Sequence, residues 1–200
     1  MTHHPIRRAA CTAVLSLFAA LGLSIAAPTT AADNAHHGDS KVKHGKYLVN
    51  TSGCIDCHTP LKMGPNGPEP DMSRHLSGHP EGLAMPPVPR LPEGPWLVVL
   101  SATNTAFAGP WGVSFTANLT PDPDTGLGQW TARNFKDTIR TGRHMGRGRP
   151  VLPPMPIPVY NNFTDEDLEA MFAYLQTLPA VENRVPEPWS PQGAAGSAGK

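Results

Sequence analysis

Two cysteines and a histidine stand together in the segment GCIDCHT, residues 53–59 of a chain of 200 residues. The order Cys-x-x-Cys-His, here Cys54, Cys57 and His58, is the attachment signature of c-type haem. Thiols one helical turn apart can bond to the two vinyl groups on one edge of the porphyrin, and the next residue carries its imidazole to the iron. Because these thioether bonds are permanent, the motif builds a large apolar plate into the fold, and the rest of the chain has to cover it.

Two other kinds of site use cysteines at this spacing. A zinc site would need a second pair of ligands, but the chain has only three cysteines and no second Cys-x-x-Cys. A disulfide of the redox type between Cys54 and Cys57 is open to an exported protein, but the adjacent His58 favours haem. An exported metal-binding or structural protein without haem is therefore the least supported class of function.

The N-terminal residues have the order of a secretory signal. A pair of arginines precedes an apolar run over residues 9–27, and small residues follow it. We predict a signal peptide over residues 1–32 with cleavage after Ala32, which places the mature chain in the periplasm without a stable membrane anchor. The alternative is an uncleaved anchor, because the apolar run is nearly long enough to span a bilayer.

The charge of the chain limits its partners. The sequence has 16 basic and 16 acidic residues, which give a formal net charge of +0 at pH 7. A protein that binds nucleic acid neutralises phosphates with an excess of basic side chains, so we exclude nucleic acid as a partner. The same balance argues against docking that depends on strong electrostatic attraction.

Prolines interrupt most of the chain after the motif. Ten of the 24 prolines fall in residues 60–95, and no helical period survives such a run. The segment WLVVL, residues 96–100, is the one strand-like piece. We predict a disordered lead over residues 33–41, a domain over residues 42–185 that contains residues 60–95 as a proline-rich insertion, and a flexible tail over residues 186–200.

Short helices are predicted before and after the prolines, over residues 43–50, 131–140 and 164–179. Thr131 and Thr164 are suited to cap the second and third of these. The last helix has apolar residues at positions i, i+3, i+4 and i+7, namely Leu168, Met171, Phe172 and Leu175. So few helices cannot bury enough apolar surface to hold such long loops, so we expect the haem to complete the core.

At this point the chain resembles the class I cytochromes c, and in particular the single-haem modules in multi-haem subunits of bacterial periplasmic dehydrogenases. The resemblance covers about residues 42–185 and rests on GCIDCH, FTANLTPDPDTGLGQWT and RPVLPPMPIPVYNNFTDEDLEAMFAYLQTLP. It implies an all-α, cytochrome c-like fold with three to four short helices around one covalent haem c and its iron. It also implies that the first and last helices cross at small and aromatic residues, here Gly45 and Tyr47 with Tyr174.

The resemblance further implies a methionine as the sixth iron ligand, opposite His58, in the loop before the last helix. Met155 in PPMPIP is the favoured candidate, because prolines stiffen the backbone that holds its thioether. Met145 in RHMGRGR is the alternative. A histidine in this place would give iron of lower potential, and the candidates are His144, His75 and His79.

Three further residues are candidates for hydrogen bonds to the haem propionates. They are Asn118, Trp130 and Arg140, which the resemblance places near the cofactor. Each also has a purely structural interpretation, since Asn118 can cap a turn, Trp130 can pack and Arg140 can be solvated.

The function predicted from these residues is electron transfer in the periplasm. With His58 and Met155 on the iron, the protein would be a carrier and not itself an enzyme, although it could be a subunit of a dehydrogenase complex. Its partners would be a periplasmic dehydrogenase on one side and another cytochrome or an oxidase on the other. The alternative is a haem protein with an open sixth site, acting as a gas sensor or as a subunit of a redox enzyme.

Overall fold

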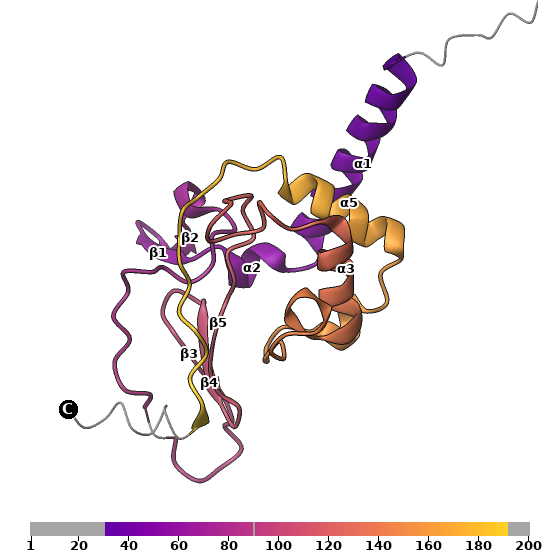
Figure 1. Ribbon diagram of the computed structural model, residues 1–200. Helices are drawn as coiled ribbons and strands as arrows, with labels where there is room; N and C mark the ends of the chain where they lie inside the picture. Colours follow the sequence, from indigo (N-terminus) through magenta and orange to yellow (C-terminus); the bar gives the residue numbers. More distant parts are fainter. Residues whose placement is uncertain (1–30, 90, 192–200) are drawn as a thin grey trace, which may run out of the picture.

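The computed structural model describes residues 31–89 and 91–191, and of residues 31–37 only the backbone. The helices are α1 (Ala31–Thr51), α2 (Cys54–His58), α3 (Ala132–Thr141), α4 (Ile157–Tyr160) and α5 (Asp165–Leu175), with short 3-10 turns at Met72–Arg74 and His144–Gly146. The strands are β1 (Leu61–Gly64), β2 (Gly67–Pro70), β3 (Val99–Leu100), β4 (Ala106–Gly109) and β5 (Gly112–Phe115). Figure 1 shows two parts, with α1, α3 and α5 together in a helical part and β3 to β5 in a strand part.

Helix α1 begins earlier than predicted. We expected a disordered lead over residues 33–41 and a helix over residues 43–50, whereas α1 runs from Ala31 to Thr51. Residues 31–51 contain no proline, and a helix whose C-terminal half is fixed by packing extends at little cost because it is already nucleated. In Figure 1 the first turns of α1 project away from the rest of the molecule.

The N-terminal segment is described only in its last residues. The predicted signal peptide lies outside the described residues, except that Ala31 and Ala32 open α1. Within residues 31–89 and 91–191, no helix combines the length and the apolar character that crossing a bilayer requires.

Helices α1 and α5 cross at a glycine, as the resemblance implied. A Cβ atom added to Gly45 would lie 1.8 Å from the carbonyl oxygen of Ala170, so no side chain fits at this point. Tyr174 of α5 is buried in the same core, but Tyr47 is 63% exposed. The prediction for Tyr47 was therefore wrong, because this ring lies on the solvent side of α1.

The two later helices begin at the predicted caps. Thr131 of α3 and Thr164 of α5 each accept a hydrogen bond from the backbone of the third helical residue, whose side chain bonds back to the cap. Helix α3 ends at Gly142, which takes the left-handed conformation with φ 64°. Helix α5 ends at Leu175, somewhat before the predicted end at Pro179.

The all-α prediction was wrong in part, because antiparallel strands pair in the proline-rich half of the chain. Strands β1 and β2 form a hairpin, and a second sheet has the order β3-β4-β5. Of the strand-like residues 96–100, only Val99 and Leu100 pair with β4. Strands β4 and β5 lack alternation because residues on both of their faces are buried, with Ala106, Val113 and Phe115 in a small core of their own.

The C-terminal arm, which we define as residues 181–189, is held against the strand part. The side chain of Asn183 donates hydrogen bonds to the carbonyls of Ser77 and His79, and the backbones of Trp189 and Val113 exchange two hydrogen bonds of 3.0 Å. The predicted flexible tail therefore fails at Trp189, whose backbone pairs with Val113. Residues 192–200 of that tail lie outside the described residues.

Candidate functional site

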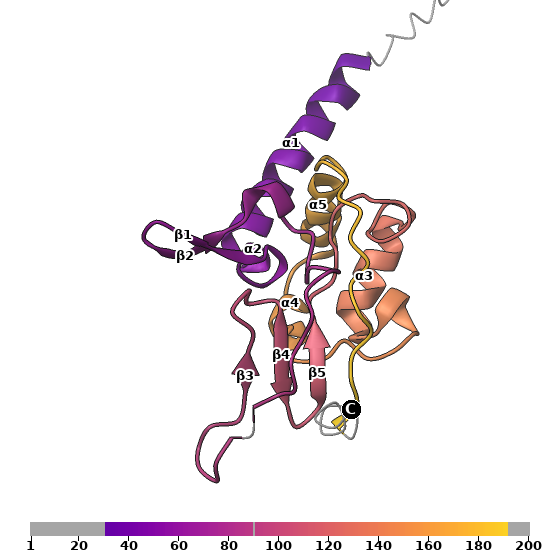
Figure 2. The same ribbon diagram turned by 90° about the vertical axis from the view of Figure 1, so that its left-hand side faces the viewer.

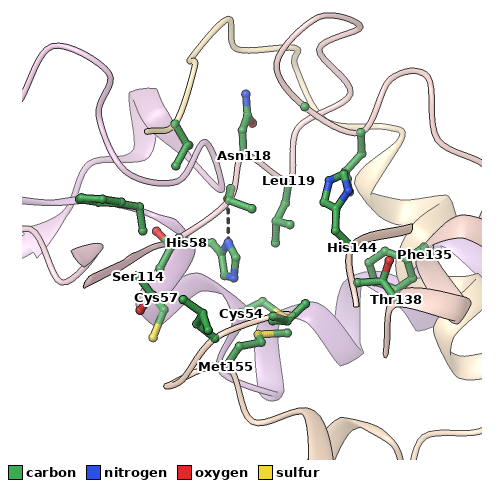
Figure 3. A pocket seen from close by; sticks show the side chains of 18 of the residues that line it. Cys54, Cys57, His58, Ser114, Asn118, Leu119, Phe135, Thr138, His144 and Met155 are labelled. Carbon is green, nitrogen blue, oxygen red and sulfur yellow. Dashed lines mark hydrogen bonds between the residues drawn. The ribbon is translucent and has the colours of Figure 1, made fainter. Parts of the chain in front are cut away.

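A cavity of about 620 Å³ lies between the helical part and the strand part. Its walls come from α2, β5, the loop after β5, α3, the loop before α4, α5 and the C-terminal arm. Figure 3 shows that Cys54, Cys57, His58 and Met155 gather in this one cavity. The structure therefore brings together the four residues that the sequence singled out for attachment and ligation.

His58 is prepared to bind a metal through one ring nitrogen. Its Nδ1 donates a hydrogen bond of 2.8 Å to the carbonyl of Ala117, which leaves Nε2 as the nitrogen with a free lone pair. Burial lowers the pKa of His58 and the bond to Ala117 opposes this shift, so the imidazole is neutral at neutral pH. A carbonyl that fixes the tautomer and orientation of a ligating histidine is the usual outer partner of such a ligand.

The two cysteines lie on the same wall as His58 and are free thiols. Gly53, with φ 81°, lets the chain turn between α1 and α2, so the short helix carries both sulfurs to the cavity. Burial raises the pKa of Cys54 and of Cys57, which keeps both thiols protonated. Helix α2 is further held by Tyr160, whose hydroxyl donates a hydrogen bond of 2.5 Å to the carbonyl of Ser52.

The structure separates the candidate sixth ligands. Met155 lines the cavity together with His58, and its loop is tied to β5 by Ser114, which donates a hydrogen bond of 2.5 Å to the carbonyl of Pro153. Met145 does not line the cavity and is 37% exposed. In Figure 3 the ring of His58 is bonded to the Ala117 loop above it, and Met155 lies below the ring.

One alternative histidine also reaches the cavity. His144 lines it and packs edge-on against Trp130, with ring centroids 5.0 Å apart. His75 and His79 do not line it, and the ring of His79 packs on Phe115 instead. The structure therefore leaves Met155 and His144 as the candidates with access to the cavity.

No family model matches the chain, but known proteins align with most of it. It is 28% identical over 174 residues to the cytochrome c subunit of alcohol dehydrogenase (quinone) from Gluconobacter oxydans, which covers 86% of this chain and 29% of the relative. It is 25% identical over 198 residues to the cytochrome subunit of fructose dehydrogenase from Gluconobacter japonicus, which covers 96% and 33%. It is 29% identical over 136 residues to the cytochrome c subunit of gluconate 2-dehydrogenase from Pantoea cypripedii, which covers 68% and 23%.

The chain resembles cytochrome c subunits of dehydrogenases over most of its length, and these comparisons support a cytochrome c module of that kind. It spans a third or less of the length of these curated relatives, which are cytochrome subunits of dehydrogenases. Its cofactor is haem c with iron, and the residues of the cavity fit that group. Two free thiols and an imidazole nitrogen lie on one wall, and apolar side chains such as Leu127 and Leu168 line much of the rest.

Asn118 uses its side-chain hydrogen bonds to hold the loop beside the cavity. It lines the cavity, but its amide nitrogen donates to the carbonyl of Val181 at 2.8 Å, and its oxygen accepts two bonds from Thr120. Figure 3 shows its side chain pointing away from His58. The structural interpretation therefore fits Asn118 better, because its bonds hold the loop that presents the Ala117 carbonyl to His58.

The two remaining propionate candidates have different positions. Trp130 lines the cavity, as predicted. Arg140 does not, so its prediction was wrong, and its guanidinium donates to the carbonyls of Asn161 and Phe163 and to the carboxylate of Asp165. The reason is that the last turn of α3 faces the start of α5, whose acidic first turn attracts the arginine.

Sequence analysis missed two arginines of the cytochrome c module. Arg149 and Arg184 line the cavity, and Arg149 forms an ion pair of 3.3 Å with Glu187 of the C-terminal arm. Guanidinium groups suit carboxylates such as haem propionates. Arg149 follows Met145 closely in a basic segment, which was a usable signal, whereas nothing in the local sequence marks Arg184.

Proposed function

We propose that this cytochrome c module transfers single electrons in the periplasm through one haem c, with His58 and Met155 as axial ligands. The observation that supports the proposal best is the meeting of these two side chains in one cavity, with Nδ1 of His58 already engaged by the Ala117 carbonyl. When bound, the haem supplies a one-electron iron couple. The residues of this chain hold the haem and shield it from water.

The proposal gives a task to several of the residues that line the cavity. Cys54 and Cys57 would hold the haem through thioether bonds, and the thioether of Met155 would favour the ferrous state of its iron. The apolar walls exclude water and favour the less charged reduced state. Trp130, Arg149 and Arg184 are the candidates that would bind the propionates at the rim.

The partners follow from the relatives. Those proteins are named as cytochrome subunits of alcohol, fructose and gluconate dehydrogenases. The module would accept electrons from a periplasmic dehydrogenase and pass them to another cytochrome or to an oxidase, without performing catalysis itself. The predicted signal peptide over residues 1–32 would place it in that compartment.

The spectrum of the holoprotein tests the ligand set. A methionine sulfur on ferric haem iron gives a weak absorption band at the red edge of the visible range, which we expect in the wild type. Met155→Ala should remove the band, lower the reduction potential and reduce stability by about 2 to 5 kcal/mol, because a packed ligand side chain is lost. The measurements are absorption spectra, potentiometric titration and chemical denaturation.

Met145→Ala is the matched control, because Met145 lies in a neighbouring loop but does not line the cavity. Met145→Ala should keep the absorption band and the reduction potential of the wild type, and its iron should remain closed to carbon monoxide. If His144→Ala removes ligation while Met155→Ala has no effect, the sixth ligand is a histidine and the proposal is wrong. A ferrous wild-type spectrum that changes with carbon monoxide would instead indicate an open site, as in a gas sensor.

A further inference from the structure

A basic hairpin follows helix α3. Residues 142–151 turn back on themselves, with backbone hydrogen bonds of 2.9 Å from Val151 to Gly142 and from His144 to Arg149. We call residues 142–151 the arginine hairpin. It contains no acidic residue and three arginines, namely Arg143, Arg147 and Arg149.

The arginine hairpin lies at the mouth of the haem cavity. His144 and Arg149 line the cavity and are also exposed to solvent, so they stand where the cavity opens. The ring of His144 packs on Trp130, which lines the cavity as well. In Figure 2 the chain turns back below α3, on the side of the molecule opposite the hairpin of β1 and β2. A protein that covers the arginine hairpin would therefore bring its own redox centre close to the haem.

The charges of the arginine hairpin are less neutralised than those of other basic side chains. On α3, Lys136 forms ion pairs with two carboxylates of α5. Among the described residues, Arg143 and Arg147 are exposed and form no ion pair, and Arg149 pairs only with Glu187, which is 84% exposed. Although the whole chain has no net charge, this face keeps an excess of positive charge.

The backbone holds these charges in fixed positions. The guanidinium of Arg143 donates a hydrogen bond of 3.1 Å to the carbonyl of Gly148, whose own N–H donates to the carbonyl of His144 at 2.8 Å. Gly146 has φ 80° and packs on α3, since a Cβ atom added to it would lie 2.8 Å from that of Asp137. A surface that is ordered before contact loses little conformational entropy when a partner binds.

We propose that the arginine hairpin is the surface on which a protein redox partner docks through an acidic patch, with electrons crossing the cavity mouth beside it. This inference rests on the proposed function, because only a haem in the cavity gives the surface a redox role. Guanidinium groups bind carboxylates through paired hydrogen bonds. The neutral chain argues against attraction over a long range, but charges at a contact act within a screening length of about 10 Å at about 0.1 M salt.

Other occupants suit the arginine hairpin less well. A membrane surface favours apolar side chains beside the basic ones, and within residues 142–151, all of which the structure describes, Met145 is the one exposed large apolar side chain. A second copy of this chain that docked hairpin to hairpin would bring like charges together, because a twofold contact places the same groups opposite each other. An acidic protein surface meets neither objection.

Small one-electron reagents of opposite charge test where electrons leave the module. The ferrous holoprotein should give one electron to the anion hexacyanoferrate(III), which becomes hexacyanoferrate(II). At about 0.1 M ionic strength, Arg147→Glu should slow this reaction roughly threefold or more and should speed the reaction with the cation tris(phenanthroline)cobalt(III), which becomes cobalt(II). Stopped-flow absorption of the haem measures both rates. The differences should vanish near about 1 M, where the screening length is about 3 Å.

Lys43→Glu is the matched control, since it makes the same change in net charge. Lys43 lies on α1, is 79% exposed and does not line the cavity, so both rates should stay close to those of the wild type. Equal effects of Arg147→Glu and Lys43→Glu would overturn the proposal, whereas an unchanged haem spectrum shows that both variants are folded. A holoprotein that neither reagent oxidises would overturn the proposed function, and this inference with it.

A binding measurement tests the chemistry of the partner without electron transfer. The holoprotein should be retained by immobilised polyglutamate at low salt. Arg147→Glu should elute at a lower salt concentration than Lys43→Glu, although the two variants have the same net charge. Equal elution of the two would overturn the proposal. Retention by vesicles of anionic phospholipid but not by polyglutamate would overturn it as well and assign the arginine hairpin to a membrane surface.

Discussion

The helical part and the strand part of this molecule are held together in different ways. In the helical part each element has its own local signals, such as the caps Thr131 and Thr164, and the helices meet through close packing at Gly45. In the strand part the strands are short, and residues distant in sequence hold them, as Asn183 and Trp189 do. From this difference we expect that packing errors destabilise the helical part most. Lost hydrogen bonds or a buried charge should destabilise the strand part most.

The largest effect is expected at the helix crossing. Gly45→Ala would place a methyl group against the backbone carbonyl of Ala170, which cannot move aside without shifting α5. We expect a loss of about 3 kcal/mol or more in the free energy of unfolding, measured by chemical denaturation of the holoprotein. Gly38→Ala in the same helix is the control, since nothing lies within 4 Å of its Cβ position, and it should be neutral or slightly stabilising.

The second effect concerns acid and the strand part. His79 is fully buried, and burial together with the nearby Arg74 lowers its pKa to about 4. The unfolded chain takes up a proton on this histidine near pH 6.5, whereas the folded protein does so only near pH 4. The free energy of unfolding therefore falls as the pH drops from about 6.5 to 4. Below pH 4 this residue causes no further change. The expected contribution over this window is about 3 kcal/mol.

His79→Gln isolates this contribution. In the wild type, Nδ1 of His79 and the hydroxyl of Thr105 form a hydrogen bond of 2.9 Å. The variant removes the titrating ring but keeps a polar side chain beside Thr105. The difference between the wild-type and variant curves of unfolding free energy against pH should shrink steadily below pH 6.5. Parallel curves would show that His79 does not carry the acid sensitivity.

A smaller effect is expected at the junction of the C-terminal arm. Asn183 is 1% exposed, donates to the carbonyls of Ser77 and His79, and accepts from the backbone N–H of Glu81. Asn183→Ala leaves these groups unpaired and should cost about 2 kcal/mol. Hydrogen exchange should rise in the strand part and much less in the helical part. Asn162→Ala, at an exposed turn, should change neither.

The smallest effect is expected at a helix cap. Thr164→Ala removes the capping box of α5 and should cost about 1 kcal/mol in the free energy of unfolding. Thr164→Ser keeps the hydroxyl and should restore most of the loss. If Thr164→Ala were more damaging than Asn183→Ala, the contrast between the two parts of the molecule would have to be abandoned.

The same contrast explains what the sequence could predict. The caps Thr131 and Thr164 depend on neighbours within a few positions, so the sequence could predict them. The crossing at Gly45 joins residues distant in sequence and was implied only by the resemblance. The partners of β4 and β5 were not, because neither strand alternates when both of its faces are buried. Arg140 was misplaced because its carbonyl partners, at Asn161 and Phe163, come from a turn whose position only the folded chain defines.

The C-terminal arm has a consequence for how the cofactor is installed. Residues 184–188 form one wall of the haem cavity, and Trp189 secures them to Val113. A chain emerges from its N-terminus, so Cys54, Cys57 and His58 are exposed well before that wall can be built. The order of residues thus leaves an interval in which the cavity lacks one side, and the later residues 184–189 close it.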